Sequence, residues 1–206
     1  MQKNKIGQRG VILGASAVLV TATQALSHHP MGGAAPATFM QGLLSGLGHP
    51  VIGFDHLAFI LAVGFVAATT KLPLAVPLSF VAASALGVLV CTAGWALPFV
   101  ESLVALSVLL AGVLLLWGGT MGGVTVAALP LALFGLFHGY AFGEAVLGAE
   151  TTPVIAYLAG LAIVQSLIIY GLVFALRAAG VLAGSAVSRL AGTSIALAGV
   201  ALLIGI

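Results

Sequence analysis

The sequence predicts an all-α membrane protein, a polytopic bundle of six transmembrane helices behind a cleaved N-terminal signal peptide. Two observations lead to this fold class. The chain of 206 residues is 62% hydrophobic and 5% charged, whereas about a quarter of the residues of a soluble domain are charged. Its apolar residues also fall into segments near the roughly 20 residues that a membrane-spanning helix needs.

The N-terminus is typical of a secretory signal peptide. Basic residues come first, a short apolar run follows over 11–20, and a small-x-small cleavage motif ends at Ser27. The basic residues are Lys3, Lys5 and Arg9. We expect residues 1–27 to be removed; the alternative is an uncleaved first helix, because the apolar run is only slightly short for a span.

The mature chain is expected to begin with a short extracytoplasmic segment, 28–48, followed by the transmembrane domain, 49–206. The predicted spans are 50–69, 74–96, 99–117, 123–145, 153–176 and 188–206. Short connections predict that helices adjacent in the sequence pack as antiparallel neighbours. Most of the 28 glycines should let helix backbones approach one another.

Basic residues predict the orientation in the inner (plasma) membrane. With the mature N-terminus outside, Lys71, Arg177 and Arg189 all fall on the inner side, as the positive-inside rule requires. The lipid bilayer is then the main partner. Basic residues are too scattered for a nucleic-acid surface, and the sequence leaves a homo-oligomer open.

A first polar island runs from His49 to His56 at the start of an apolar span. Ionisable groups there cost about 2.5–3.5 kcal/mol each at mid-bilayer, so they need a use. Pro50 suits a first helical position, which would make His49 the N-cap and place it on one helix face with His56. Together with Asp55, these donors suit Ni²⁺, Co²⁺, Zn²⁺ or Cu²⁺; the alternative is a structural His–Asp pair.

A second polar island runs from Phe137 to Glu144, and the predicted topology puts it on the same side as the first. Gly139 and Gly143 make a local break or a close helix contact plausible, and either would bring Glu144 inward. Alternatives are a helix–helix hydrogen bond for His138 and a solvated helix end for Glu144. The candidate metal ligands are therefore His49, Asp55, His56, His138 and Glu144.

Other candidates lie outside the two islands. His28 and His29 could form a secondary metal-capture site next to the new N-terminus. Tyr140 and Gln165 could line a pathway, with a packing hydrogen bond as the alternative for Gln165. The single cysteine, Cys91, excludes an internal disulfide framework. No phosphate-binding loop or other permanent cofactor site is expected.

The two islands resemble the HupE/UreJ family of hydrogenase and urease accessory membrane proteins. The first is similar to its H-P-x-x-G-x-D-H-x7-G signature and the second to its H-G-x-A-x-G-E block. The matching residues are His49, Pro50, Gly53, Asp55, His56, Gly64, His138, Gly139, Ala141, Gly143 and Glu144. Residues 149–153 are similar to the cyanobacterial branch. The resemblance covers the whole chain and implies a nickel or cobalt permease for metalloenzyme or cobalamin assembly.

The function expected from the sequence is secondary uptake of a divalent transition metal ion, not catalysis. One alternative is an intramembrane zinc hydrolase similar to the ceramidases, because three His and one Asp could hold Zn²⁺ with an activated water. Another is a metal sensor or delivery partner without flux of its own. Measured uptake distinguishes the three.

Overall fold

The computed structural model describes residues 34–118 and 124–205, and these residues form helices without a strand. The helices are α2 (Phe39–Ile52), α3 (Phe54–Thr69), α4 (Ala75–Thr92), α5 (Val100–Trp117), α6 (Val124–Gly143), the short 3₁₀ helix η1 (Glu144–Val146), α7 (Thr151–Ala178) and α8 (Ala186–Ile204). The predicted signal peptide and the pair His28–His29 lie outside the described residues.

Five of these helices, α4 to α8, are long and apolar enough to cross a membrane, and the bent pair α2–α3 supplies a sixth span if it is counted as one. The predicted multi-pass helical fold is therefore confirmed. The predicted spans end within a few residues of the helices. The exception is the first, where the helix begins at Phe39 because the Thr38 side chain caps it by accepting a hydrogen bond from the Gln41 amide.

The first span is broken where α2 meets α3. The two helices differ in direction by 77° across Gly53, whose backbone is extended. Pro50 lies in the last turn of α2, where it removes a backbone donor and weakens the helix. The prediction that His49 caps a helix and shares its face with His56 is therefore wrong, because the two residues lie on different helices.

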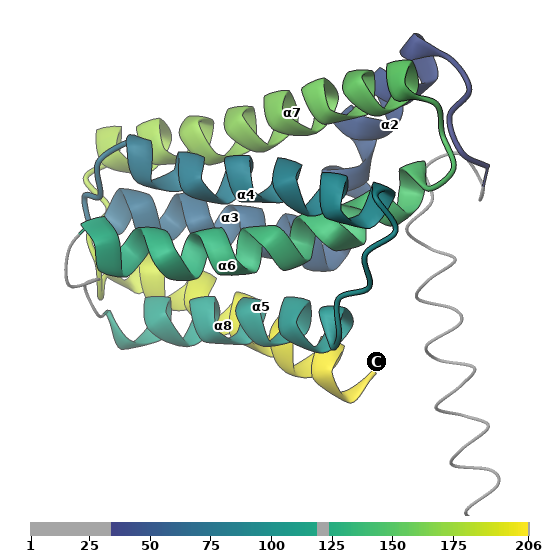
Figure 1. The fold of residues 1–206 in the computed structure, drawn as a ribbon. Helices are drawn as coiled ribbons and strands as arrows, with labels where there is room; N and C mark the ends of the chain where they lie inside the picture. Colours follow the sequence, from purple (N-terminus) through teal and green to yellow (C-terminus); the bar gives the residue numbers. More distant parts are fainter. Residues whose placement is uncertain (1–33, 119–123, 206) are drawn as a thin grey trace, which may run out of the picture.

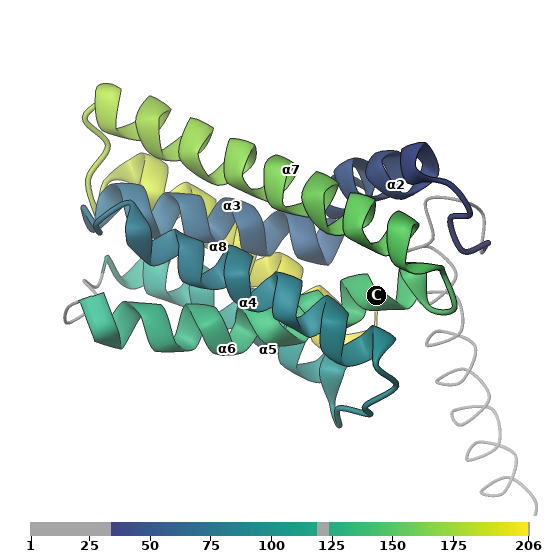
Figure 2. The ribbon, with the colours of Figure 1, turned by 45° about the horizontal axis from the view of Figure 1, so that its top comes forward.

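The most extensive helix contacts join α4 with α6, α5 with α8 and α2 with α7 (Figures 1 and 2). These partners are not adjacent in the sequence, so the prediction that sequential helices are the main neighbours is wrong. Glycines explain the choice: a Cβ on Gly139 would overlap the Ser84 carbonyl, and a Cβ on Gly112 would overlap the backbone of Ala196. The prediction that glycines serve helix contacts is confirmed.

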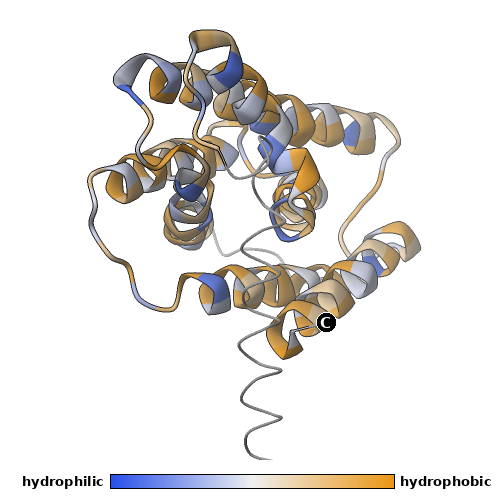
Figure 3. Ribbon diagram, turned by 90° about the vertical axis from the view of Figure 1, so that its right-hand side faces the viewer, coloured by the Kyte–Doolittle hydropathy of each residue, from blue (hydrophilic) through white to orange (hydrophobic). Residues whose placement is uncertain are grey.

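The two ends of the bundle differ in their polar residues. One end holds the α2–α3 break, the α4–α5 connection and η1, and Figure 3 looks onto it. The opposite end holds Lys71 between α3 and α4, Arg177 in the last turn of α7 and Arg189 in the first turn of α8. Arg177 Nη2 donates hydrogen bonds to the carbonyl oxygens of Ala67, at 2.9 Å, and Leu72, at 2.6 Å.

Candidate metal-binding site

Three buried histidines meet at the end of the bundle that contains the α2–α3 break. His49 comes from α2, His56 from α3 and His138 from α6, and each is at most 2% exposed. The His56 ring lies between the other two, with centroid distances of 5.7 Å to His49 and 5.2 Å to His138. The two polar islands therefore come together in space.

The sequence between His49 and His56 makes this meeting sterically feasible. The bend at Gly53 turns α2 away from α3, so the two histidines approach from different helices. A Cβ on Gly53 would lie 2.8 Å from Cδ2 of His56 and 3.3 Å from Oδ1 of Asp55. Glycine is thus required here for space, because its backbone conformation is one that any residue adopts.

Ser107 fixes the ring of His138 through a hydrogen bond that its Oγ accepts. Ser107 Oγ lies 2.6 Å from the Val104 carbonyl oxygen and 2.8 Å from Nε2 of His138. A hydroxyl has one proton, so donating it to the carbonyl leaves the oxygen to accept from Nε2–H. We therefore assign the lone pair of His138 to Nδ1. This atom lies 3.0 Å from Nδ1 of His56 and accepts a hydrogen bond from its N–H.

Tyr157 fixes the ring of His49 in the same way. Its hydroxyl donates to the Phe142 carbonyl oxygen at 2.8 Å and therefore accepts from Nδ1–H of His49, also at 2.8 Å. The lone pair of His49 is then on Nε2. A hydrogen bond on one ring nitrogen that fixes the tautomer is the arrangement found around metal-ligating histidines.

Aromatic side chains surround the three imidazoles. Phe142 packs against His56 at a centroid distance of 4.1 Å and against His49 at 5.1 Å. Phe59 stacks on His138 at 4.5 Å. Both phenylalanines are at most 2% exposed. The imidazoles therefore lie in a region of low dielectric, where their hydrogen bonds and any bound charge count for more than in water.

Asp55 lies at the edge of this cluster. Its Oδ2 is 3.9 Å from Nδ1 of His56, and its side chain is 14% exposed. It belongs to the first turn of α3, where the positive end of the helix dipole favours a carboxylate. Asp55 therefore adds negative charge beside His56 while keeping some contact with the outside.

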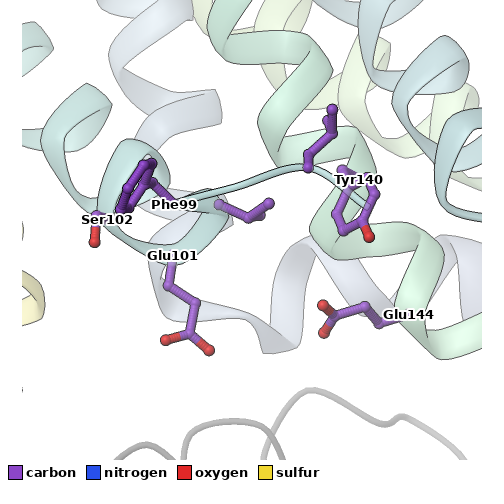
Figure 4. Close-up of a pocket in the computed structure, with 7 residues that line it drawn as sticks. Phe99, Glu101, Ser102, Tyr140 and Glu144 are labelled. Carbon is purple, nitrogen blue, oxygen red and sulfur yellow. The ribbon is translucent and has the colours of Figure 1, made fainter. Parts of the chain in front are cut away.

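Glu144 and Tyr140 line a separate surface pocket of about 360 Å³ together with Glu101 (Figure 4). Glu144 is exposed, and the three buried histidines are not among the residues that line this pocket. Helix α6 continues to Gly143, because its glycines serve contacts with α4: a Cβ on Gly143 would meet Cys91. Of the two roles expected for these glycines, the structure has the close helix contact and not the break, in an α6 that is described throughout these residues. The expectation that Glu144 turns inward is wrong, because Glu144 is exposed.

Gln165 is fully buried in the middle of α7, and its Nε2 donates to Ser84 Oγ at 3.0 Å. Within the described ranges, no group of three or more His, Cys, Asp or Glu side chains is arranged to hold a metal ion. The site is thus a set of hydrogen-bonded imidazoles with fixed tautomers. The lone pairs lie on Nε2 of His49 and on Nδ1 of His138, and the second accepts a hydrogen bond from Nδ1–H of His56.

Sequence reasoning gave no role to Tyr157 and Ser107, which position the histidines. A usable signal was nevertheless present. A buried polar side chain in a membrane helix must find a partner, because lipid supplies none. A tyrosine and a serine inside otherwise apolar spans therefore indicate hydrogen-bond partners for the ionisable residues on other helices.

Comparison with known proteins agrees with the two islands. Residues 16–202 match the family described as HupE / UreJ protein. The chain is 38% identical over 167 residues to Protein HupE from Rhizobium leguminosarum bv. viciae, an alignment that covers 80% of this chain and 85% of that relative. No solved structure matches the chain. Since the matched residues include both polar islands and nearly the whole bundle, the chain belongs to the HupE/UreJ family.

Proposed function

We propose that this protein takes up a divalent transition metal ion, nickel or cobalt, through the inner membrane for the assembly of a metalloenzyme or of cobalamin. The ion is the cargo of a secondary permease. Membership of the HupE/UreJ family supports this proposal. The observation that carries it is the buried trio of histidines, whose outer rings are fixed by Tyr157 and Ser107.

Capture by the imidazoles would begin at His49 and His138. Each already presents a lone pair and has a hydrogen bond on its other ring nitrogen, so neither has to change tautomer. His56 lies between them and would move its proton from Nδ1 to Nε2, which leaves the lone pair of Nδ1 for the ion. At a metal–nitrogen distance of about 2.1 Å, two ligands at a right angle are about 3.0 Å apart. This matches the 3.0 Å between Nδ1 of His56 and Nδ1 of His138.

Two carboxylates would attract the ion to the site and neutralise part of its charge. Asp55, beside His56 and partly exposed, would neutralise part of its charge. Glu144 would attract it at the surface of the same end of the bundle. In our proposal this end faces the extracytoplasmic side, because the basic residues Lys71, Arg177 and Arg189 are at the other end.

Uptake into proteoliposomes tests the proposal directly. The purified full chain should pass Ni²⁺ or Co²⁺ inward, in side-by-side competition with Zn²⁺ and Cu²⁺, and His56→Ala should abolish uptake. Ser194→Ala is a matched control, because that exposed hydroxyl donates only to the Leu190 carbonyl oxygen and should leave uptake unchanged.

Two results would contradict the permease. Metal binding without flux would favour a sensor or delivery partner. Zn²⁺-dependent hydrolysis of a lipid amide by the same preparation would favour the hydrolase. Both are measured on the protein used for uptake, so one preparation decides between the three functions.

A further inference from the structure

Gln165 is the one buried side-chain amide in the described part of the chain, and half of it is unsatisfied. Its Nε2 donates to Ser84 Oγ, while its Oε1 is buried and accepts no hydrogen bond. Such a group destabilises a fold by about 1–3 kcal/mol. A membrane span has no water in the lipid to compensate. The carbonyl oxygen of Gln165 therefore calls for an explanation other than packing.

The position of Gln165 along α7 is informative. It is eight residues beyond Tyr157 and twelve before Arg177, about 12 Å and about 18 Å at 1.5 Å per residue. Tyr157 is hydrogen-bonded to His49 of the buried trio. Arg177 donates to the carbonyl oxygens of Ala67 and Leu72 at the opposite end of the bundle, which is called the closed end below. Gln165 thus lies in the interior between the histidines and that closed end.

Ser84 contacts both Gln165 and Gly139, the residue after His138. Gly139, the residue that follows His138, packs so closely on α4 that a Cβ on it would overlap the Ser84 carbonyl. The hydroxyl of the same Ser84 receives the hydrogen bond from Gln165. A continuous set of contacts therefore runs from His138 through α4 to the amide of Gln165.

We propose that Oε1 of Gln165 contacts the ion after it leaves the histidines, with Ser84 as the positioning residue that holds the amide. This inference rests on the proposed function. Ser84 takes up the N–H side of the amide, which leaves the carbonyl oxygen for a cation. Side-chain amide and carboxylate oxygens both bind divalent metal ions.

Hydroxyls nearer the closed end are engaged elsewhere. Thr69 Oγ1 donates to the Phe65 carbonyl oxygen at 2.8 Å, and Ser79 Oγ donates to that of Val76 at 2.7 Å. Ser79 Oγ also lies 3.2 Å from the Ala128 carbonyl oxygen on α6, so both hydroxyls are engaged with backbone carbonyl oxygens. Gln165 Oε1 differs from these hydroxyls because it is buried without a hydrogen-bond partner.

The test compares Gln165→Leu with Gln165→Glu in the full chain, using equilibrium Ni²⁺ binding in detergent and Ni²⁺ or Co²⁺ uptake in proteoliposomes. With Leu, binding at the histidines should persist and the melting temperature should not fall. The maximal uptake rate should drop at least about tenfold, which corresponds to about 1.4 kcal/mol. Glu retains an oxygen and should restore most of the rate.

Ser188→Ala is the matched control, because it also removes a fully buried polar group, one that donates to the Leu115 carbonyl oxygen on the α5–α8 contact. Its uptake should equal that of the wild type. Wild-type uptake by Gln165→Leu overturns the inference and leaves the proposed function standing. Equal loss of uptake and melting temperature in both Gln165 variants shows a packing role and overturns it as well. If the wild type passes no metal, the proposed function fails and this inference fails with it.

Discussion

The two ends of the bundle use their polar side chains in different ways. At the end with the α2–α3 break, side chains bond to one another, His56 to His138 and His49 to Tyr157, in addition to the bonds that Tyr157 and Ser107 donate to backbone carbonyl oxygens. At the opposite end, Arg177 and Tyr170 donate to backbone carbonyl oxygens of the α3–α4 region. Backbone acceptors are fixed by the helices, whereas an imidazole can move its proton to its other ring nitrogen and turn a lone pair toward a new partner. In the proposed function, the ion is therefore bound at one end, and the side chains of the other end hold helices together.

The largest change in stability is expected at Gly139, where α6 packs on α4 next to His138. In Gly139→Ala, the new Cβ overlaps the Ser84 carbonyl, so α4 and α6 must separate. We expect the free energy of unfolding to fall by about 1–3 kcal/mol, as overpacking usually costs. Ni²⁺ affinity should fall too, because His138 is the preceding residue. Thermal unfolding in detergent and Ni²⁺ titration measure both, and a wild-type melting temperature would contradict the contact.

A matched pair of tyrosines tests the two ends against each other. Tyr157→Phe removes the hydroxyl that fixes the tautomer of His49 and should lower Ni²⁺ affinity about 10–100-fold, the usual effect of such partners. Tyr170→Phe removes a hydroxyl that donates to the Leu74 carbonyl oxygen at 2.8 Å and should leave the affinity unchanged. Isothermal titration measures both variants. Equal affinities for the two would remove the functional difference between the ends.

Much of the histidine end could be predicted from the sequence, but its geometry could not. Hydropathy located the spans because lipid requires about 20 apolar residues in each. Pro50, however, fits both the start of a helix and its weakened last turn. The packing of α2 on α7, where a Cβ on Gly46 would overlap the Tyr157 carbonyl, is what places Pro50 in the last turn of a helix. Local sequence does not contain that contact.

Glu144 shows the same limit at the other island. The glycines around it left a break in α6 or a close helix contact open; Gly139 and Gly143 serve the contact with α4, and Glu144 follows as the exposed first residue of η1. Whether a membrane glycine bends a helix or lets a neighbour approach depends on the neighbour. The pairing of α4 with α6 is a long-range property. The meeting of His56 and His138 depends on that arrangement of helices as well.

A smaller effect is expected at the closed end. Arg177→Gln loses charged hydrogen bonds to the carbonyl oxygens of Ala67 and Leu72. We expect the free energy of unfolding to fall by about 1.5 kcal/mol, the lower value for hydrogen bonds to charged groups. Ni²⁺ affinity should not change, because the three histidines lie at the opposite end of the bundle. A loss of affinity would show that the ends are coupled and would contradict their separation.

The smallest expected effect comes from Gly171→Ala, on α7 toward the closed end. A Cβ there meets no atom of another element within 4 Å. Since alanine is a better helix residue than glycine, the variant should be slightly more stable, by about 0.5–1 kcal/mol. The same substitution at Gly139 should be destabilising, so the two melting temperatures should move in opposite directions. Equal shifts would mean that glycine acts here through chain flexibility, and the glycine contacts would then not explain how α4 and α6 hold the histidine end together.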